Sequence, residues 1–472
     1  MSTRGQKCLG TELGRYAAAL RFDDLPADVI EKLKVCIFFN LGIAIAGAPL
    51  VRQGVGVATR FPTADGPAAR VLVVGTRVPP AQAAFANALM MHARAQDDFQ
   101  HCANAHIGTV ATPAILALAD WHESDGRSFL AANAVAYQVA TILGDGFAAI
   151  TTPRGFRATG IYGTPGAAAG CARILGLNET QAAHAIGLAA SLASGIGQPW
   201  VSGSMEWRLQ IAHASRTAVD CALLAQAGLD AAPDAYEGRY GFYMAHAGTA
   251  PRVEEMLARL YGPWRTESIG FKPLPVCAIN QGPAINAIEV QRTTRIAPEQ
   301  IAAIEIQLPG EDAAYPGIAA TGPIRSAGEA LMRSAFVVAV CLSKGCLSYT
   351  DLEIRDDPKV LALAERTRVV ANNELPPLSH VLKIEVRDHS LVERPFQASG
   401  REFFLGRPEI RMVLHGIRDE LALPFDRIDM LEDAIWRLDN NTRPIDLVSL
   451  LVQGEGERRR PPSASSLQKS KN

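Results

Sequence analysis

The hydrophobic and polar positions of the first 269 residues follow the three- and four-residue spacing of α-helices. In one such segment the regularly spaced apolar residues are Val29, Leu33, Cys36, Ile37 and Leu41. Three further segments, 81–93, 112–121 and 163–175, are rich in alanine or glycine, which allows neighbouring helix backbones to approach closely. The pattern therefore predicts a large domain of closely packed helices.

After residue 270 the pattern changes to a mixture of strands and helices. Segments 303–308 and 380–386 alternate apolar and polar residues, which is the period of a half-buried strand. Segment 285–290, just before the first of these strands, and segment 327–342, between the two, have helical spacing. This part of the chain is therefore predicted to form an α+β unit.

Helical spacing returns after Glu409 and continues to about Val452, although residues 411–414 fit either a short helix or a strand. We therefore predict a mainly α fold, in which a large helical domain is interrupted by a smaller α+β domain. The last residues are low in complexity and are expected to be disordered. The predicted boundaries are 1–269 and 405–453 for the helical domain, 270–404 for the inserted domain and 454–472 for the tail.

Composition and charge narrow the class of protein. Of the 472 residues 48% are hydrophobic, and the net charge of -2 excludes a nucleic-acid binder that depends on a broad basic surface. The most apolar stretch starts at Val35, contains Asn40 and ends at Pro49, so it is shorter than the roughly 20 residues that span a bilayer. The first 14 residues contain no apolar run of the signal-peptide type, and the eight cysteines form no Cys-x-x-Cys pair. We expect a cytoplasmic protein that contacts neither nucleic acid nor membrane.

The densest group of chemically active side chains lies in the segment 92–108, which is predicted to connect two helices. It contains His92, His101 and His106 together with Asp97 and Asp98. Histidine titrates near neutral pH, and a neighbouring carboxylate orients its ring and raises its basicity. In the alternative interpretation, the carboxylates cap a helix and the histidines are solvated. Asp97, His101 and His106 could also bind a metal, but the interpretation without a metal is preferred.

Three further segments hold candidate functional residues. Residues 155–166 place several glycines at a helix entry, where free backbone N–H groups suit an anion, although tight packing also explains these glycines. No strand precedes them, so a dinucleotide-binding fingerprint is rejected. Residues 203–210 form the next polar cluster. Lys272 lies between Phe271 and two prolines at the predicted domain junction, where it could meet a carboxylate or simply lie on the surface.

Taken in order, these segments resemble the MmgE/PrpD family, which includes 2-methylcitrate dehydratase, cis-aconitate decarboxylase and iminodisuccinate epimerase. The resemblance covers about residues 10–452. It rests on Asn40–Gly47, Ala86-Asn87, His92, Asp97-Asp98, His106-Ile-Gly, Gly155-Phe156, residues 163–169, Gly203-Ser204, residues 237–242 and Phe271-Lys272-Pro273. It implies a large helical domain with a smaller α+β lid, a homodimer, and no metal or organic cofactor.

The resemblance also implies roles for individual residues. His106 is the leading acid/base group, Lys272 holds a carboxylate or enolate, and three other residues assist them. The assisting catalytic candidates are His101, Asp98 and Tyr162. The substrate-binding candidates are Arg157, Asp97, Gln100, Ser204, Trp207, Gln210, Cys277 and Phe336.

The chain departs from the family pattern at several expected catalytic positions. Seven catalytic positions of the family, in chain order Asp, Thr, His, Lys, His, His and Tyr, are replaced here. Their counterparts in the same order are Ala95, Phe99 or Gln100 (for the Thr), Arg157, Trp207, Gln210, Cys277 and Phe336. Trp207 and Phe336 remove polar partners and add apolar surface, while Arg157 restores one cation that can bind a carboxylate through two hydrogen bonds. Since a tricarboxylate needs several cationic partners, we expect a substrate with fewer carboxylates and a larger apolar portion.

Two classes of function follow. The first is a cofactor-independent lyase or isomerase that dehydrates, decarboxylates or epimerises a small organic acid next to a carboxylate, for example in a specialised pathway. In such reactions negative charge develops on a carbon or its enediolate, so an acid/base group and cationic partners are needed. The second is a non-catalytic paralogue that keeps the fold and the dimer and acts as a binding or scaffold protein, since several family residues are replaced together.

Overall fold

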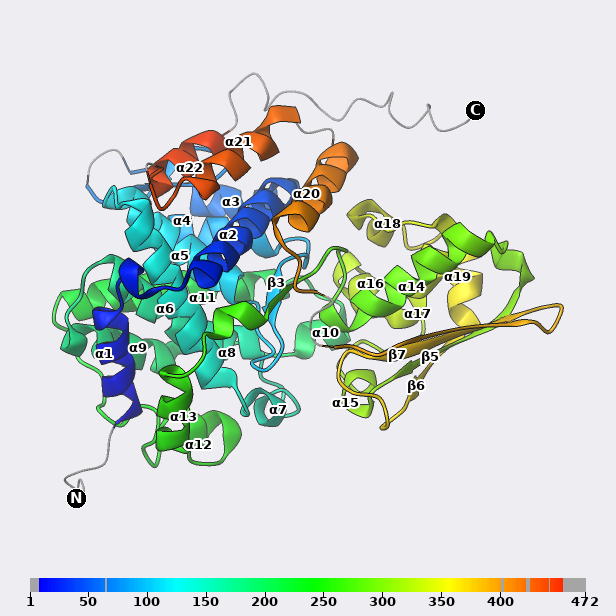
Figure 1. Ribbon diagram of the computed structural model, residues 1–472, viewed down its shortest axis with the longest axis horizontal. Helices are drawn as coiled ribbons and strands as arrows, with labels where there is room; N and C mark the ends of the chain where they lie inside the picture. The colour runs from blue at the N-terminus through cyan, green and yellow to red at the C-terminus, as the bar shows by residue number, and fades with distance from the viewer. Residues whose placement is uncertain (1–7, 64–65, 400–402, 422–424, 441, 453–472) are drawn as a thin grey trace.

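The protein is mainly α-helical, as the sequence pattern predicted (Figure 1). The computed structural model describes residues 8–63, 66–399, 403–421, 425–440 and 442–452. The predicted tail, residues 454–472, lies outside the described residues. Figure 1 shows a large helical body on the left and a smaller body of helices and strands on the right.

The helical body is formed by the first part of the chain and by the last helices. Its first helices are α1 Leu9–Ala19, α2 Ala27–Gly47, α3 Arg52–Ala58, α4 Pro80–His92, α5 Ile107–Trp121, α6 Gly126–Gly144, α7 Ala148–Thr151, α8 Ala158–Ile174, α9 Glu179–Leu192, α10 Gln198–Ser202, α11 Trp207–Gln226, α12 Phe242–Ala247 and α13 Val253–Leu260. The returning helices are α20 Arg407–Leu421, α21 Phe425–Trp436 and α22 Pro444–Leu451. They pack on α2 and α5, and buried side chains from residues 9–271 and 410–451 share one hydrophobic core.

Small residues allow the central helices to pack as closely as the sequence predicted. A Cβ added at Gly166 of α8 would lie 2.4 Å from the Cβ of Ala140 in α6. A Cβ at Gly170 would lie 2.8 Å from the carbonyl oxygen of Ala132. Both distances are too short for a side chain, so glycine is required where α8 crosses α6.

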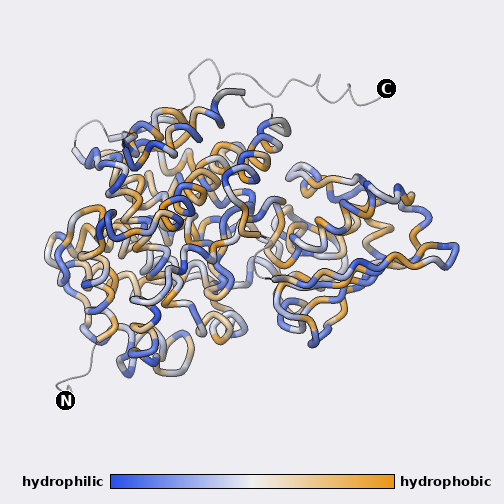
Figure 2. The backbone as a smooth tube through the Cα atoms, in the orientation of Figure 1, coloured by the Kyte–Doolittle hydropathy of each residue, from blue (hydrophilic) through white to orange (hydrophobic). Residues whose placement is uncertain are grey.

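Among the described residues, one helical segment is apolar and long enough to cross a membrane by length and composition alone, which corrects the expectation that the apolar stretch from Val35 is too short. This segment is Ala27–Ala58, and 83% of its most apolar window is buried inside the protein. Hydrophobic residues, orange in Figure 2, run along the helices of both bodies. The segment therefore fits the core helix that the sequence predicted.

The smaller body has a four-stranded sheet covered on one face by helices (Figure 1). Its strands are β5 Ile301–Leu308, β6 Thr367–Ala371, β7 His380–Val386 and β8 Leu391–Phe396, in the order β6-β5-β7-β8. β5 and β6 are parallel, and the other pairs are antiparallel. Its helices are α14 Ala278–Thr294, α15 Gly310–Ala313, α16 Ala327–Met332, α17 Ser334–Lys344, α18 Tyr349–Glu353 and α19 Pro358–Glu365.

Local patterns predicted two of these four strands. The predicted segments 303–308 and 380–386 lie in β5 and β7, so both predictions are confirmed. β6 is short, and β8 carries charged residues and a proline at the sheet edge, so neither has a clear alternation of apolar and polar residues. The predicted helix 327–342 is in fact two helices separated at Arg333, and residues 411–414 are helical.

The segment 92–108 is more ordered than the connecting loop that the sequence predicted. It contains β3 Asp98–Gln100, which pairs antiparallel with β4 Ile269–Phe271. A separate two-stranded pair joins β1 Ala69–Arg70 and β2 Arg77–Val78. The helix expected from residue 112 begins five residues earlier, at Ile107, so that His106 is its N-cap residue.

Candidate active site

The pairing of β3 with β4 brings two distant candidate segments together. Asp98 lies opposite Phe271, and the backbone N–H of Lys272 donates to the carbonyl oxygen of Asp97 at 3.2 Å. Successive side chains on extended backbone point to opposite faces. Asp97 therefore meets Lys272, whereas Asp98 points into the helical core.

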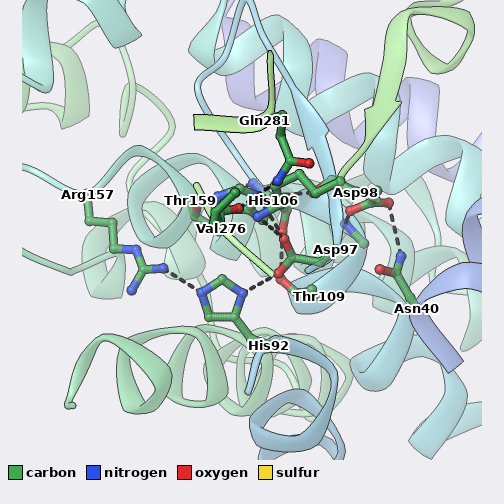
Figure 3. Close-up of polar contacts among 12 residues, drawn as sticks. Asn40, His92, Asp97, Asp98, His106, Thr109, Arg157, Thr159, Val276 and Gln281 are labelled. Carbon is green, nitrogen blue, oxygen red and sulfur yellow. Dashed lines mark hydrogen bonds and ion pairs between the residues drawn. The ribbon is translucent and has the colours of Figure 1, made fainter. Parts of the chain in front are cut away.

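Asp97 is the centre of a buried cluster (Figure 3). Its Oδ1 pairs with Lys272 Nζ and lies 3.2 Å from His106 Nδ1, while its Oδ2 contacts His92 Nδ1. The side chains of Asp97, His92 and Lys272 are at most 1% exposed, but that of His106 is 22% exposed. Of these four side chains, His106 is therefore the one that solvent can reach.

Helix ends fix the cluster in place. His92 is the last residue of α4, His106 is the N-cap residue of α5, and Arg157 is the N-cap residue of α8. The backbone N–H of His106 donates to Thr159 Oγ1 at 3.1 Å, and Thr109 Oγ1 donates to the His106 carbonyl at 2.9 Å. The His106 ring is thus attached to a rigid backbone.

The cluster holds one fixed anion and two neutral histidines near neutral pH. Burial alone would raise the pKa of Asp97, but the charge of Lys272 and the contacts with His106 and His92 lower it well below the usual value. Burial lowers the pKa of His92 to about 3. Burial and the charge of Lys272 also lower the pKa of His106. Both imidazoles are therefore uncharged, and each has one ring nitrogen that carries a lone pair and can accept a hydrogen bond or a proton.

Arg157 lies on the opposite side of His92 from Asp97 (Figure 3). Its Nη2 is 2.6 Å from His92 Nε2, and its Nη1 donates to the Trp207 carbonyl and to Gln210 Oε1. Its guanidinium group also lies 5.1 Å from the ring centre of Trp200. Burial lowers the pKa of Arg157 to about 10, so the side chain still carries a positive charge at neutral pH.

Asp98 belongs to a separate network behind the cluster. Its Oδ2 accepts from Asn40 Nδ2 at 3.0 Å and from the hydroxyl of Tyr137, and its Oδ1 accepts from the Gly108 N–H at 3.1 Å. Burial raises the pKa of Asp98 to about 6, against the effect of these hydrogen bonds. This carboxyl anchors β3 and the first turn of α5 to the helical core.

Comparison with known proteins identifies the family. A model of the MmgE/PrpD N-terminal domain matches residues 11–254, which is more than half of the chain. The chain belongs to the MmgE/PrpD family. It is 26% identical over 477 residues to a cis-aconitate decarboxylase of Aspergillus terreus. The matched region covers 93% of this chain and 95% of that protein.

Two further relatives of this MmgE/PrpD protein carry the same or a similar description. The cis-aconitate decarboxylase-like protein oryM of Aspergillus oryzae is 25% identical over 475 residues, covering 94% of this chain and 97% of that protein. The cis-aconitate decarboxylase of Homo sapiens is 29% identical over 205 residues, which is 42% of each chain. The resemblance found in the sequence is confirmed at the level of the family.

The structure brings several of the predicted site residues together. Asp97, His106 and Lys272 touch directly, and Arg157 joins them through His92. Two other candidates, Trp207 and Gln210, line Arg157. The Trp207 ring is fully buried and lies edge-on to His92, with ring centres 5.0 Å apart.

Other predicted residues lie away from the Asp97 cluster. The Tyr162 hydroxyl lies 3.0 Å from Thr151 Oγ1 and its ring packs against Phe242. His101 is exposed on the turn before His106, and Gln100 donates to the Arg265 carbonyl and to Ser268 Oγ. These contacts suit structural roles better than proton transfer. Ser204 is half-buried before α11.

The last two candidates lie in the α+β unit. Phe336 is fully buried in the hydrophobic core of that unit. Cys277 is the N-cap residue of α14, and burial raises the pKa of its thiol to about 12. The thiol is therefore protonated at neutral pH.

Sequence patterns placed His92 in the histidine-rich segment but not among the site residues, and they did not indicate Trp200 or Tyr315. His92 bridges Asp97 and Arg157, and Trp200 covers the guanidinium group. Tyr315 follows α15. Burial raises the pKa of its hydroxyl, and the nearby charge of Arg157 offsets only part of this rise. The density of histidines in the segment 92–108 was the signal that pointed to His92. The sequence carries no signal for the other two, because they reach the site from separate elements.

Among the described residues, no group of three His, Cys, Asp or Glu side chains is arranged to hold a metal ion. Two surface hollows, of about 260 Å³ and 520 Å³, lie elsewhere in the helical body. The first is lined by residues of α13 and by Tyr261, which follows it, and the second by residues of α21, α22 and the turn between them. Neither hollow contains a residue of the Asp97 cluster.

Proposed function

We propose that this protein is a cofactor-independent lyase or isomerase that acts next to the carboxylate of a small organic acid. The observation that carries the proposal is the buried contact of Asp97 with both Lys272 and His106, with the His106 ring partly open to solvent. The two Aspergillus relatives are described as a cis-aconitate decarboxylase and a cis-aconitate decarboxylase-like protein, and both match nearly the whole chain. Both observations support a lyase of the same general kind.

The hydrogen bonds of His106 support its role as the acid/base group. Its Nδ1 lies 3.2 Å from Asp97 Oδ1 and 3.0 Å from the Asp98 carbonyl oxygen. Both partners are acceptors, so Nδ1 carries the ring proton and Nε2 has a free lone pair. Because the pKa of His106 is lowered, Nε2 is unprotonated at neutral pH and can take a proton from carbon or from water.

The charge balance of the site supports an anionic substrate. Asp97 supplies one negative charge, while Lys272 and Arg157 supply two positive charges, all in a region with little solvent exposure. Helices α5 and α8 also begin at the site, and helix N-termini favour anions. One substrate carboxylate would neutralise the single excess positive charge. This favours a substrate with fewer carboxylates than methylcitrate or cis-aconitate.

The apolar surroundings support a larger apolar portion in the substrate. Trp200 and Trp207 pack together beside Arg157, with ring centres 5.1 Å apart. A carboxylate that binds Arg157 brings the rest of the molecule close to these rings. The exclusion of water there would strengthen the attraction between Arg157 and the carboxylate. An organic acid from specialised metabolism fits this environment.

The remaining predictions on organisation form part of the same proposal. We take residues 270–404 as a lid domain, because most of the Asp97 cluster is buried and a substrate needs a path to it. A cytoplasmic homodimer without metal or organic cofactor, and without nucleic-acid or membrane partners, completes the proposal.

A substrate panel tests the proposal. The purified protein is incubated in deuterated buffer with cis-aconitate, 2-methylcitrate, and mono- and dicarboxylic acids that carry alkyl or aryl groups. NMR then detects loss of carbon dioxide or water and deuterium exchange next to the carboxylate. We expect turnover of an acid with one or two carboxylates, and a loss of about 10²–10⁴-fold in His106→Asn. Lys272→Met is expected to lose turnover as well.

Matched controls are His389→Asn, at an exposed hairpin turn, and Lys359→Met, whose side chain is 73% exposed. Both are expected to keep wild-type turnover. A His106→Asn variant as active as the wild type would contradict the assignment. Binding of acids without any turnover would favour the non-catalytic paralogue.

A further inference from the structure

We propose that His92 is a positioning residue and that Arg157 locks it in the tautomer with the proton on Nδ1. In this state His92 donates to Asp97 and has no free lone pair, so that His106 alone is left to exchange protons with a substrate. The inference rests on the proposed function for its catalytic meaning. Its structural part stands on the contacts of Arg157, His92 and Asp97 (Figure 3).

The tautomer of His92 follows from its two neighbours. Arg157 Nη2 lies 2.6 Å from His92 Nε2, and a guanidinium group has only donors. Nε2 must therefore accept, so it carries no proton. The proton then lies on Nδ1, which faces Asp97 Oδ2, an acceptor. A His92 with the proton on Nε2 would place a donor against a donor on one side and a lone pair against a carboxylate on the other.

Arg157 is itself held in this orientation. Its Nη1 donates to the carbonyl of Trp207 and to Gln210 Oε1, the latter at 3.3 Å. Its guanidinium lies over Trp200, and the His92 ring meets Trp207 edge-on. Arg157 is 6% exposed and His92 is 1% exposed, so water does not compete for these contacts. The lock is therefore built into the resting protein.

The lock makes two similar histidines unequal. Both His92 and His106 present Nδ1 to the same carboxylate, that of Asp97. Arg157 occupies Nε2 of His92, whereas the ring of His106 is partly exposed. A cation on Nε2 also opposes protonation of His92, because an imidazolium there would face a guanidinium at 2.6 Å. Asp97 therefore stays ionised and paired with Lys272, while His92 stays neutral.

NMR of histidine ring nitrogens tests the lock without a substrate. The full chain is labelled with ¹⁵N-histidine, and long-range ¹H–¹⁵N correlations are recorded from roughly pH 5.5 to 8.5, the range in which an ordinary histidine titrates. His92→Asn assigns the His92 signals. We expect a protonated Nδ1 and an unprotonated Nε2 at every pH. His184 is the internal reference, because its Nδ1 accepts from the Ala231 N–H at 3.2 Å and its proton must be on Nε2.

Substitution of Arg157 tests the cause. In Arg157→Gln we expect His92 to lose its fixed pattern, with exchange between tautomers or protonation in the acidic part of the range. The exposed Arg154→Gln, in the same turn, is the control and should leave the pattern unchanged. An Arg157→Gln variant with the wild-type His92 pattern would overturn the inference. So would a proton on Nε2 of His92 in the wild type, a result that does not depend on the folding of Arg157→Gln.

The two proposals fail separately. Absence of turnover across the substrate panel contradicts the proposed function but leaves the tautomer measurement valid. A wrong tautomer on His92 contradicts the lock even where turnover is found.

Discussion

Neighbouring residues at the site have opposite electrostatic properties because their side chains point to different partners. Asp97 faces Lys272, whose charge helps to lower the carboxyl pKa well below the usual value. Asp98 faces Asn40, Tyr137 and the Gly108 N–H, none of which is a cation, so burial prevails and raises its pKa to about 6. Two adjacent residues therefore have different roles: Asp97 is the charged centre of the site, and Asp98 is a structural carboxyl.

Replacement of Asp98 by Asn should make stability less dependent on pH. A raised pKa in the folded state means that the stability contributed by Asp98 is fully present below its unfolded pKa of 3.8 and is lost as the pH rises through about 6. The amide cannot ionise, and Asn40 Oδ1, which has no hydrogen-bond partner, can turn to accept from it. In urea unfolding at several pH values, the free energy of unfolding of Asp98→Asn should rise relative to that of the wild type from about pH 4 to pH 7.

The control for this experiment is the exposed Asp230→Asn, which should follow the wild type at every pH. A wild type that gains on Asp98→Asn as the pH rises would show that the three hydrogen bonds, and not burial, determine the charge of Asp98.

At the scale of elements, the sequence predicted what depends on local periodicity. The alternation in 303–308 and 380–386 predicted β5 and β7, and the spacing of small residues predicted the close packing of α8. β3 and β4 were not predicted, because each has three residues and is stabilised by a partner far away in the chain. For the same reason, the sequence could not show that β3 and β4 bring Asp97 to Lys272.

The glycine at the crossing of α6 and α8 gives a prediction at this scale. Gly166→Ala should destabilise the protein by about 1–3 kcal/mol, because its Cβ would overlap the side chain of Ala140 and force the helices apart. Gly56→Ala in α3 is the matched control, since a Cβ there meets nothing within 4 Å and alanine is the better helix former. It should stabilise by about 0.5–1 kcal/mol. Denaturant unfolding measures both, and equal effects would contradict the role of close packing.

At the scale of the molecule, the two bodies meet through side chains that no local pattern reveals. Trp200 and Trp207 lie in the helical part of the sequence but pack into the hydrophobic core of the α+β unit. Arg325 Nη2 in turn reaches the Val201 carbonyl of the helical body, at 3.5 Å. The sequence predicted which segments form each body. Their contact depends on these pairings, and so does the position of the site beside it.

The Asp97–Lys272 pair gives the prediction at this largest scale, because it fastens the segment that leads into the α+β unit to the helical body. Asp97→Asn leaves Lys272 buried without its carboxylate and should cost about 3–5 kcal/mol of stability at neutral pH. Asp97→Asn with Lys272→Met removes the unpaired charge as well, so it should recover part of that loss. Denaturant unfolding of the three proteins measures both effects.

The pH dependence distinguishes the loss of this pair from a general loss of packing. A carboxyl whose pKa is lowered by folding contributes its full stability above its unfolded pKa of 3.8, and the contribution is lost as the pH falls through and below that value. The difference between the wild type and Asp97→Asn should therefore be largest near neutral pH and should shrink in acid. A difference that is constant with pH, or a double variant less stable than Asp97→Asn, would show that the charge of Asp97 does not hold this junction together.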